Sequence, residues 1–162
     1  EGPDDADIVM ALFTDYQCPA CRRAAPDLAA AVRADGRVRL IYRDWPIFGA
    51  VSDTAARVAL AANRQGIYPA VHQRLMRQPL PLDRAAMERA VRDAGGDWLR
   101  IERDIREHEA EISGMLARTL RDAFALGLTG TPAFLIGPRL VLGAIDQAGF
   151  ERAFAAVRKT QI

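Results

Sequence analysis

An apolar run of strand length passes directly into a helical pattern, and a pair of cysteines lies at the junction. Residues 8–14 (IVMALFT) are almost entirely apolar, which is typical of a buried central strand. After a three-residue break, Cys18-Pro19-Ala20-Cys21 begins a segment with apolar residues at three- and four-residue spacing. Pro19 suits the first turn of such a helix, where the missing backbone N–H is not needed. This strand–loop–helix unit limits the possible folds more than any other part of the chain.

The segment that follows completes a βαβ unit. The helical spacing ends near residue 34, and Gly36 is placed to end the helix in a left-handed conformation. Residues 38–42 (VRLIY) then predict a second strand. A strand, a helix and a strand in close succession predict two parallel strands joined by the helix.

The middle of the chain predicts helices only, and strands return near its end. Between residues 53 and 125, successive segments carry apolar residues at helical spacing. These segments are expected to begin at Ser52 or Asp53, Tyr68, Asp83, Asp97 and Ala110. Residues 133–136 and 140–142 flank a short turn and predict an antiparallel hairpin, after which Asp146 begins a last amphipathic helix. The order βαβ, helices, ββα predicts one mixed sheet covered by helices.

Length and charge exclude several classes of protein. A chain of 162 residues can bury a core without disulfide cross-links, so its two cysteines need not be structural. The net charge is +1 and no dense basic block occurs, which gives no support for nucleic acid or an anionic membrane surface as a partner. No apolar run approaches the roughly 18 residues of a membrane span. The acidic first residues lack the order of a signal peptide, but a mature exported protein from which the signal peptide has been removed also lacks one, so this says nothing about export.

The placement of the cysteines predicts a reactive dithiol. The free N–H groups and the dipole at a helix N-terminus stabilise an anion, which lowers the pKa of Cys18 and makes it the attacking thiolate. Cys21 lies one turn further along and can attack the resulting mixed disulfide. Arg22 would add positive potential unless its helical direction turns it into solvent. Two other interpretations are a pair of ordinary buried thiols and half of a zinc site, although no second cysteine pair or nearby histidine pair supplies the remaining zinc ligands.

Two further features are candidates for the same site. Thr131-Pro132 follows a glycine-containing loop and directly precedes an apolar strand, so this peptide bond is a candidate for the cis form. Tyr16 lies two residues before Cys18. We expect its side chain to flank an exposed sulfur and to contact a substrate.

The chain resembles the DsbA-like branch of the thioredoxin superfamily along nearly its whole length. The resemblance is carried by FTDYQCPACRRAAPDL at residues 13–28, YRDWPIFG at 42–49, QGIYPAVHQRLM at 65–76 and GLTGTPAFLIG at 127–137. It implies an α/β, thioredoxin-like fold, in which βαβ and ββα units form one mixed sheet with an inserted helical subdomain. In the implied single domain, residues 1–162, the core comprises residues 7–50 and 127–162, and the helical insertion comprises residues 51–126.

The resemblance also implies an activity. In that family the first cysteine attacks, the second resolves the mixed disulfide, and a cis-proline loop faces the pair. Cys18 would then be the nucleophile, Cys21 the resolving thiol and Thr131-Pro132 the facing loop, whose backbone at Thr131 pairs with an extended substrate. Pro19 and Ala20 complete the motif. The implied protein is a thiol–disulfide oxidoreductase with no cofactor and no metal, monomeric, in the periplasm or bacterial cell envelope. Its partners would be reduced or misoxidised proteins and a redox partner protein in the membrane that resets the dithiol.

Three departures from the family pattern favour a milder thiol than that of the strongest oxidases. Ala20 stands where those enzymes carry histidine, and Thr131 stands where valine is usual. Many relatives have a buried acid six residues before the nucleophile; here that position is Leu12, and Asp15 nearby is expected to be exposed. The direction of exchange therefore stays open between oxidase and isomerase or reductase. A hypothesis from another class is a copper-binding protein that uses the thiolate pair.

Overall fold

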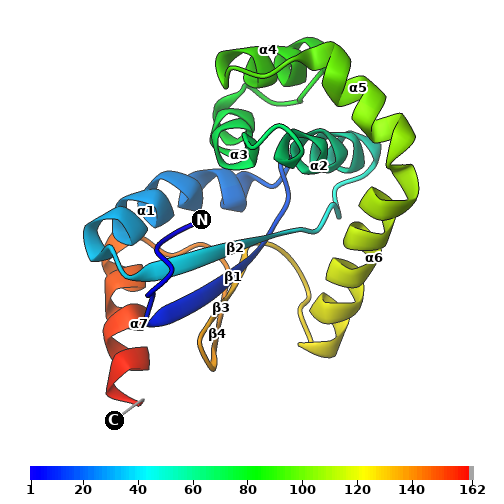
Figure 1. The fold of residues 1–162 in the computed structure, drawn as a ribbon. Helices are drawn as coiled ribbons and strands as arrows, with labels where there is room; N and C mark the ends of the chain where they lie inside the picture. Colours follow the sequence, from blue (N-terminus) through cyan, green and yellow to red (C-terminus); the bar gives the residue numbers. More distant parts are fainter. Residues whose placement is uncertain (161–162) are drawn as a thin grey trace.

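The apolar run at residues 8–14 forms an inner strand of a four-stranded sheet. The computed structural model describes residues 1–160. Strand β1 (Ile8–Thr14) is parallel to β2 (Val38–Asp44) on one side and antiparallel to β3 (Ala133–Ile136) on the other, and β3 pairs with β4 (Arg139–Leu142). The order is β2-β1-β3-β4, which confirms the predicted mixed sheet and α/β fold (Figure 1).

Two helices cover one face of this sheet. Helix α1 (Pro19–Asp35) connects β1 to β2, and Gly36 ends it with φ 72°, as predicted. Helix α7 (Gln147–Lys159) packs beside α1, and the Asp146 carboxylate caps it by accepting from the backbone of Gly149 at 2.8 Å. The buried side chains between helices and sheet include Met10, Ala24, Leu28, Phe134, Phe150 and Phe154. Each large side chain buried there contributes about 1.5–3 kcal/mol to folding.

The residues between β2 and β3 form a separate group of helices. These are α2 (Ala50–Asn63), α3 (Tyr68–Arg77), α4 (Arg84–Asp93), α5 (Trp98–Glu107) and α6 (Glu109–Ala125). The predicted caps Asp83 and Asp97 accept backbone hydrogen bonds at the starts of α4 and α5. Helix α2 begins at Ala50, before the predicted Ser52 or Asp53, and the buried Ser52 hydroxyl donates to Asp15 instead of capping the helix.

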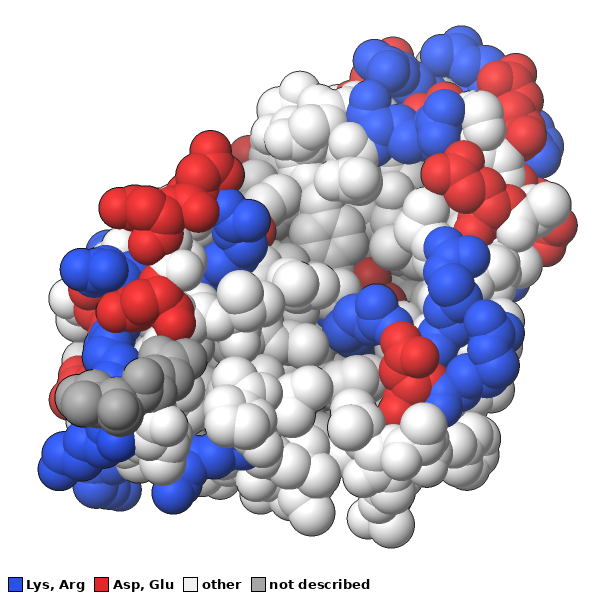
Figure 2. Space-filling view, turned by 60° about the horizontal axis from the view of Figure 1, so that its bottom comes forward, with Lys and Arg blue, Asp and Glu red and all other residues white. Residues whose placement is uncertain are grey.

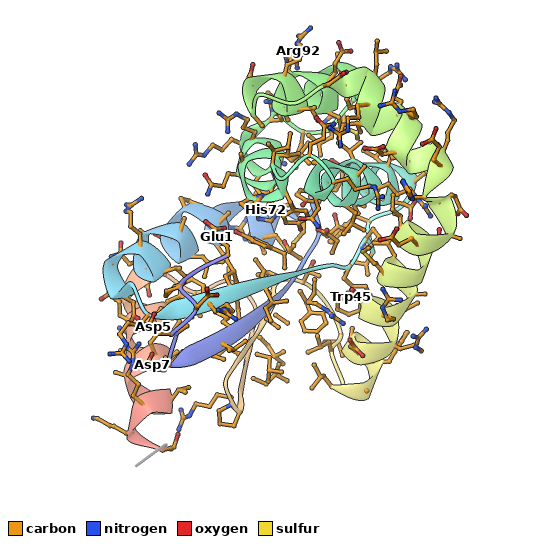
Figure 3. The ribbon with its side chains drawn as sticks, in the orientation of Figure 1. Glu1, Asp5, Asp7, Trp45, His72 and Arg92 are labelled. Atoms are coloured by element: carbon orange, nitrogen blue, oxygen red, sulfur yellow. The ribbon has the colours of Figure 1, made fainter. Side chains whose placement is uncertain are left out.

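The cysteine pair lies where this helical group meets the sheet. Cys18 and Cys21 belong to the apolar core that α2, α3, α4 and α5 share, rather than to the core beneath α1 and α7. In Figure 1, α3, α4 and α5 lie above the sheet and α6 runs along one side of the molecule. There the end of α6 contributes Ala123 to a small core with Trp45, labelled in Figure 3, and Phe13.

The other face of the sheet is partly uncovered. Its exposed apolar side chains are those of Val9, Ile41, Leu140 and Leu142. Figure 2, viewed toward the side at the bottom of Figure 1, shows a broad uncharged area between two groups of charged side chains. Within residues 1–160, no helix has the length and apolar character needed to span a bilayer.

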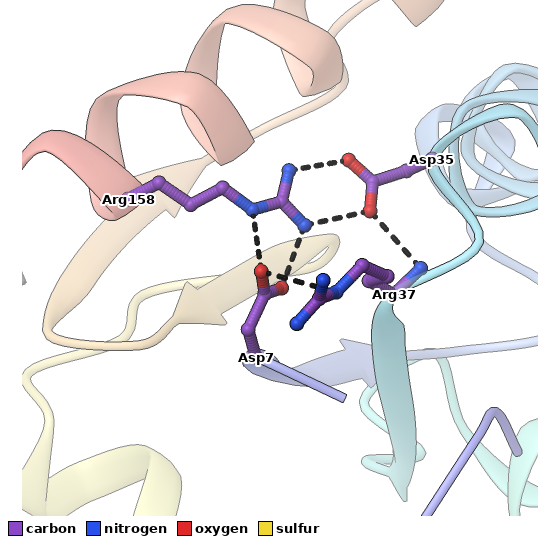
Figure 4. A network of polar contacts seen from close by, with 4 residues as sticks. All are labelled: Asp7, Asp35, Arg37 and Arg158. Atoms are coloured by element: carbon purple, nitrogen blue, oxygen red, sulfur yellow. Dashed lines mark hydrogen bonds and ion pairs between the residues drawn. The ribbon is translucent and has the colours of Figure 1, made fainter. Parts of the chain in front are cut away.

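A network of charged side chains joins the two ends of the chain (Figure 4). The Arg158 guanidinium on α7 donates two hydrogen bonds to Asp7, before β1, and two to Asp35, at the end of α1, at 2.7–3.0 Å. Arg37 adds an ion pair with Asp7 at 3.4 Å. The hydrogen bonds from Arg158 hold the pKa of both carboxyls below its ordinary value.

Candidate dithiol site

Cys18 is the N-cap residue of α1, which places its sulfur at the helix N-terminus. Its backbone is extended, with φ −71° and ψ 115°, and its Sγ accepts a hydrogen bond from the Cys21 backbone N–H at 3.2 Å. Its own backbone N–H donates to the Asp15 carbonyl at 3.2 Å. A sulfur in this position receives the N–H groups that a helix leaves unpaired in its first turn, so negative charge is stabilised there.

The predicted loop at Thr131-Pro132 faces the pair from the start of β3, the strand that pairs with β1. The peptide bond between these residues is cis. The Cys18 thiol donates to the Thr131 carbonyl at 3.3 Å, although the two residues are 113 positions apart. Pro132 is buried and lines a small cavity with Cys21. The fold thus brings together the two motifs that the sequence analysis had singled out separately.

The two thiols have opposite pKa shifts. The hydrogen bond from the Cys21 thiol, supported by Thr131 and by backbone N–H groups, lowers the pKa of Cys18 to about 6, and burial opposes this shift only in part. The same contact with Cys18, together with burial, raises the pKa of Cys21. At neutral pH the reduced site therefore carries one thiolate, on Cys18, and one thiol, on Cys21.

The prediction that Tyr16 flanks an exposed sulfur is wrong. Tyr16 and Cys18 are each only 1% exposed. The Tyr16 ring points into the protein, where its hydroxyl lies 3.0 Å from Nδ1 of His72, because buried polar partners are available there. Pro19 is exposed and Ala20 is half-buried, so these two residues form the surface of the motif.

Asp15 is also buried, contrary to expectation. Its carboxylate accepts hydrogen bonds from the backbone of Gln17 at 2.7 Å, from the backbone of Ile47 and Phe48 at 2.7 and 3.0 Å, and from the Ser52 hydroxyl at 2.6 Å. These four donors replace the water that the carboxylate loses on burial. Asp15 therefore ties the loop before Cys18 to the loop after β2.

Arg22 points inward rather than into solvent. Its guanidinium donates to the carbonyls of Tyr16 at 2.9 Å and Leu75 at 3.0 Å, and also to that of Gln78. Leu75 and Gln78 are at the C-terminal end of α3, where helix carbonyls lack partners within the helix. Arg22 thereby joins the active-site helix to the inserted helices.

A buried polar chain behind the dithiol was not predicted. The Tyr68 hydroxyl donates to Asp44 at 2.9 Å and lies 3.4 Å from the Tyr16 hydroxyl, which in turn contacts His72. Burial raises the pKa of Asp44 to about 7 and lowers that of His72, labelled in Figure 3, to about 3. The only sequence signal for this chain was an acid directly after an apolar strand, which more often indicates a turn.

Possible metal ligands lie elsewhere in the molecule. Among residues 1–160, Asp104, Glu107 and His108 place ligand atoms within 4.8 Å of one another near the junction of α5 and α6. Asp104 is already ion-paired with Arg100 at 3.6 Å. This group is separate from the cysteines, and the expectation that the dithiol needs no metal stays a prediction.

Solved structures of two known proteins superpose on nearly the whole of this chain. A thioredoxin-like oxidoreductase from Silicibacter pomeroyi DSS-3 superposes with a TM-score of 0.91 at 38% identity, over 98% of this chain and 91% of that one. The thiol-disulfide exchange protein alpha-DsbA2 from Wolbachia pipientis superposes with a TM-score of 0.91 at 25% identity, over 97% of this chain and 85% of that one.

Similarity at the level of sequence extends to part of a larger protein. The Na⁺/H⁺ antiporter NhaA 1 of Mycolicibacterium vanbaalenii is 30% identical over 98% of this chain but only 26% of its own length. The chain spans about a quarter of the length of the curated relatives it matches. The profile of the DSBA-like thioredoxin domain matches residues 9–155, which is most of the chain. The chain therefore belongs to the family of DSBA-like thioredoxin domains.

Proposed function

We propose that this protein is a thiol–disulfide oxidoreductase that exchanges disulfides with polypeptide substrates through Cys18 and Cys21. The observation that carries the proposal is the position of the Cys18 sulfur, between the Cys21 backbone N–H and the Thr131 carbonyl at the N-terminus of α1. The helix N-terminus and the hydrogen bond from the Cys21 thiol stabilise the Cys18 thiolate near neutral pH, whereas the Thr131 carbonyl can accept a hydrogen bond only from the thiol form. The thiolate is the reactive form in disulfide exchange.

The exchange proceeds in two displacements. A substrate thiolate attacks Sγ of Cys18 in the oxidised pair, the Cys18–Cys21 bond breaks, and Cys21 takes its electron pair and then a proton. A second substrate thiolate attacks the substrate sulfur of this mixed disulfide, and Cys18 leaves as a thiolate. The substrate loses two electrons and the protein gains two. The reverse sequence begins with attack by the Cys18 thiolate and reduces a substrate disulfide.

In this proposal the loop at Thr131-Pro132 binds the substrate. Thr131 precedes β3, so its backbone continues the line of a strand beside Cys18. An extended substrate can pair with this backbone, which recognises polypeptides without requiring one sequence. We propose reduced or misoxidised exported proteins as substrates and the periplasm or cell envelope as the compartment, because disulfides persist in oxidising compartments. The same proposal includes a redox partner in the membrane that resets the dithiol. It also includes a monomeric state and the division of the chain into a core and a helical insertion at residues 51–126.

The direct test is to trap the mixed disulfide. Cys21→Ala, incubated with an oxidised test protein such as insulin, should accumulate a disulfide-linked adduct on Cys18, detected by mass spectrometry. Cys18→Ala is the matched control and should form none, because the remaining thiol has a raised pKa. If both variants form equal adduct, or neither does, the proposed roles are wrong. Stoichiometric copper binding by a wild-type protein without exchange activity would favour the metal-binding hypothesis.

A further inference from the structure

Cys21 must gain or lose a proton in every turnover, and its surroundings offer few acceptors. The residue is 3% exposed, and contact with Cys18 and burial both favour its neutral thiol. Leu12 on β1 lines the same small cavity as Cys21, and its buried side chain is apolar and offers no acceptor there. Some other group has to carry this proton if Cys18 and Cys21 exchange disulfides as proposed above.

One buried carboxyl lies at the end of a hydrogen-bonded chain of side chains that begins at His72, behind the dithiol. Asp44 at the end of β2 is 3% exposed, and its Oδ2 accepts from the Tyr68 hydroxyl at 2.9 Å. The Tyr68 hydroxyl lies 3.4 Å from that of Tyr16, and the Tyr16 hydroxyl lies 3.0 Å from Nδ1 of His72. The chain therefore has four members from three parts of the fold, all buried.

The chain reaches Cys21 through a small cavity. Cys21 and His72 line the same space of about 10 Å³, together with Pro132 and Met76. This is on the scale of one water molecule. Of the described residues that line it, His72 is the only titratable one besides Cys21. The imidazole is held neutral by burial, so one ring nitrogen can accept a proton while the other gives one up.

The other end of the chain lies beside a second cavity. Asp44 lines a space of about 240 Å³ between β2 and α6, together with Arg43, Arg118 and Thr119. Arg118 is exposed, so this cavity reaches the surface. Within the described residues, Oδ1 of Asp44 is buried without a hydrogen-bond partner. The charged neighbours of Asp44 are Asp15, Arg43 and Arg118. The charge of Asp15 disfavours the carboxylate form of Asp44. Arg43, one of the two arginines that line the cavity, is itself ion-paired with Asp122.

We propose that Asp44 is the acid–base group of the dithiol, which exchanges the Cys21 proton along the relay His72–Tyr16–Tyr68. When Cys21 resolves a mixed disulfide, its proton moves through a water molecule in the shared cavity to His72. His72 then passes one to Tyr16, Tyr16 passes one to Tyr68, and Tyr68 protonates Asp44. Each relay member ends with as many protons as it began with. Cys21 becomes the attacking thiolate and Asp44 becomes a neutral acid. The reverse transfer protonates Cys21 when Cys21 leaves the Cys18–Cys21 disulfide. This inference rests on the disulfide exchange proposed above.

The test measures the resolving step by itself. Reduced protein is mixed with oxidised glutathione, and release of glutathione from the Cys18 mixed disulfide is followed between pH 5 and 9. In the wild-type protein the rate should rise with an inflection near pH 7, as Asp44 becomes able to accept a proton. Asp44→Asn should slow release about tenfold or more and remove the inflection. Tyr68→Phe should do the same while Asp44 is still present, because it interrupts the relay.

Two controls separate a relay from a structural role. Asp104→Asn replaces another buried acid, on α5, and should keep the wild-type profile. The alkylation rate of Cys18 against pH should be the same in the wild-type protein, Asp44→Asn and Tyr68→Phe, since neither residue contributes to the lowered pKa of Cys18. If Tyr68→Phe or a folded Asp44→Asn keeps the inflection and the rate, the relay is wrong. If the wild-type protein forms no mixed disulfide, the proposed function fails and the relay fails with it.

Discussion

At the scale of single residues, the reactivity of the site depends on how each sulfur shares a proton with its neighbours. The two thiols are three positions apart, yet the structure stabilises the anion of one and the neutral form of the other. The helix N-terminus alone would favour negative charge on Cys18. The contact with Cys21 adds to this effect, so the pair behaves as one titrating unit rather than as two independent groups.

The first prediction concerns this coupling. The thiolate of Cys18 can be followed by its ultraviolet absorbance. In the reduced wild-type protein, Cys18 should titrate with a midpoint of about pH 6. Cys21→Ala should move the midpoint upward toward the ordinary cysteine value, because the hydrogen bond from Cys21 is the largest cause of the shift. Cys18→Ala should show no transition in the acidic range. An unchanged midpoint in Cys21→Ala would show that the helix N-terminus alone lowers the pKa.

A second prediction concerns Asp44 and the stability of the fold. Burial raises its pKa to about 7 in the folded protein, whereas an unfolded aspartate titrates near the ordinary value of 3.8. Between these two values the folded state binds more protons, so the free energy of unfolding falls as pH rises, by at most about 1.4 kcal/mol per pH unit. Asp44→Asn should therefore give a flatter dependence between pH 4 and 7 in urea titrations. Parallel curves for the two proteins would contradict the assignment.

At the scale of elements, buried polar side chains join loops that the sequence separates. Asp15 connects the loop before α1 to the loop after β2, and Arg22 connects α1 to the end of α3. These two contacts lie on opposite sides of Cys18 in the sequence. Together they fix the start of α1, and with it the direction of the Cys18 sulfur.

The third prediction tests the Asp15 connection. Asp15→Ala leaves three backbone N–H groups and the Ser52 hydroxyl without their acceptor. We expect a loss of about 3 kcal/mol or more in the free energy of unfolding, since each unsatisfied buried group costs about 1–3 kcal/mol. Asp93→Ala removes an exposed carboxyl at the end of α4 and should change stability by less than about 0.5 kcal/mol. Equal losses in both variants would mean that Asp15 has no special anchoring role.

The elements and the polar contacts differ in how far the sequence could predict them. Helix ends such as Gly36, Asp83 and Asp97 were predictable because a cap acts within one turn of the chain. The burial of Asp15 was not, because three of its four donors lie more than 30 residues away. Tyr16 was placed wrongly for the same reason, since its partner His72 is 56 positions distant. The cysteines and the proline loop were found because each has a local signature.

At the scale of the whole molecule, the fold joins its two chain ends near the C-terminal helix. Arg158 on α7 forms the center of this junction, with Asp7 and Asp35 on either side of its guanidinium (Figure 4). The junction lies at the end of α1 that is remote from Cys18, so it supports the sheet without taking part in the exchange.

The fourth prediction separates this junction from the active site. Arg158→Met keeps much of the side-chain length but removes four hydrogen bonds to two carboxylates. Thermal unfolding should occur at a lower temperature, and the difference should shrink at high salt because these charges are partly exposed. The pH profile of Cys18 alkylation should stay that of the wild-type protein. A salt-independent loss of stability would point to lost packing of the arginine stem instead.

The central claim is that Cys18 and Cys21 form a reversible redox pair, and its most direct test is an equilibrium titration against glutathione. The protein is incubated at a series of glutathione ratios, and the fraction of oxidised pair is measured after acid quenching. We predict a single two-electron transition with a potential between about −270 and −120 mV, the values for thioredoxin and for a strong oxidase. The lowered pKa of Cys18 stabilises the reduced form, while the methyl side chain of Ala20 adds no hydrogen bond to that of its backbone. A pair that stays fully reduced or fully oxidised at every glutathione ratio would contradict the claim.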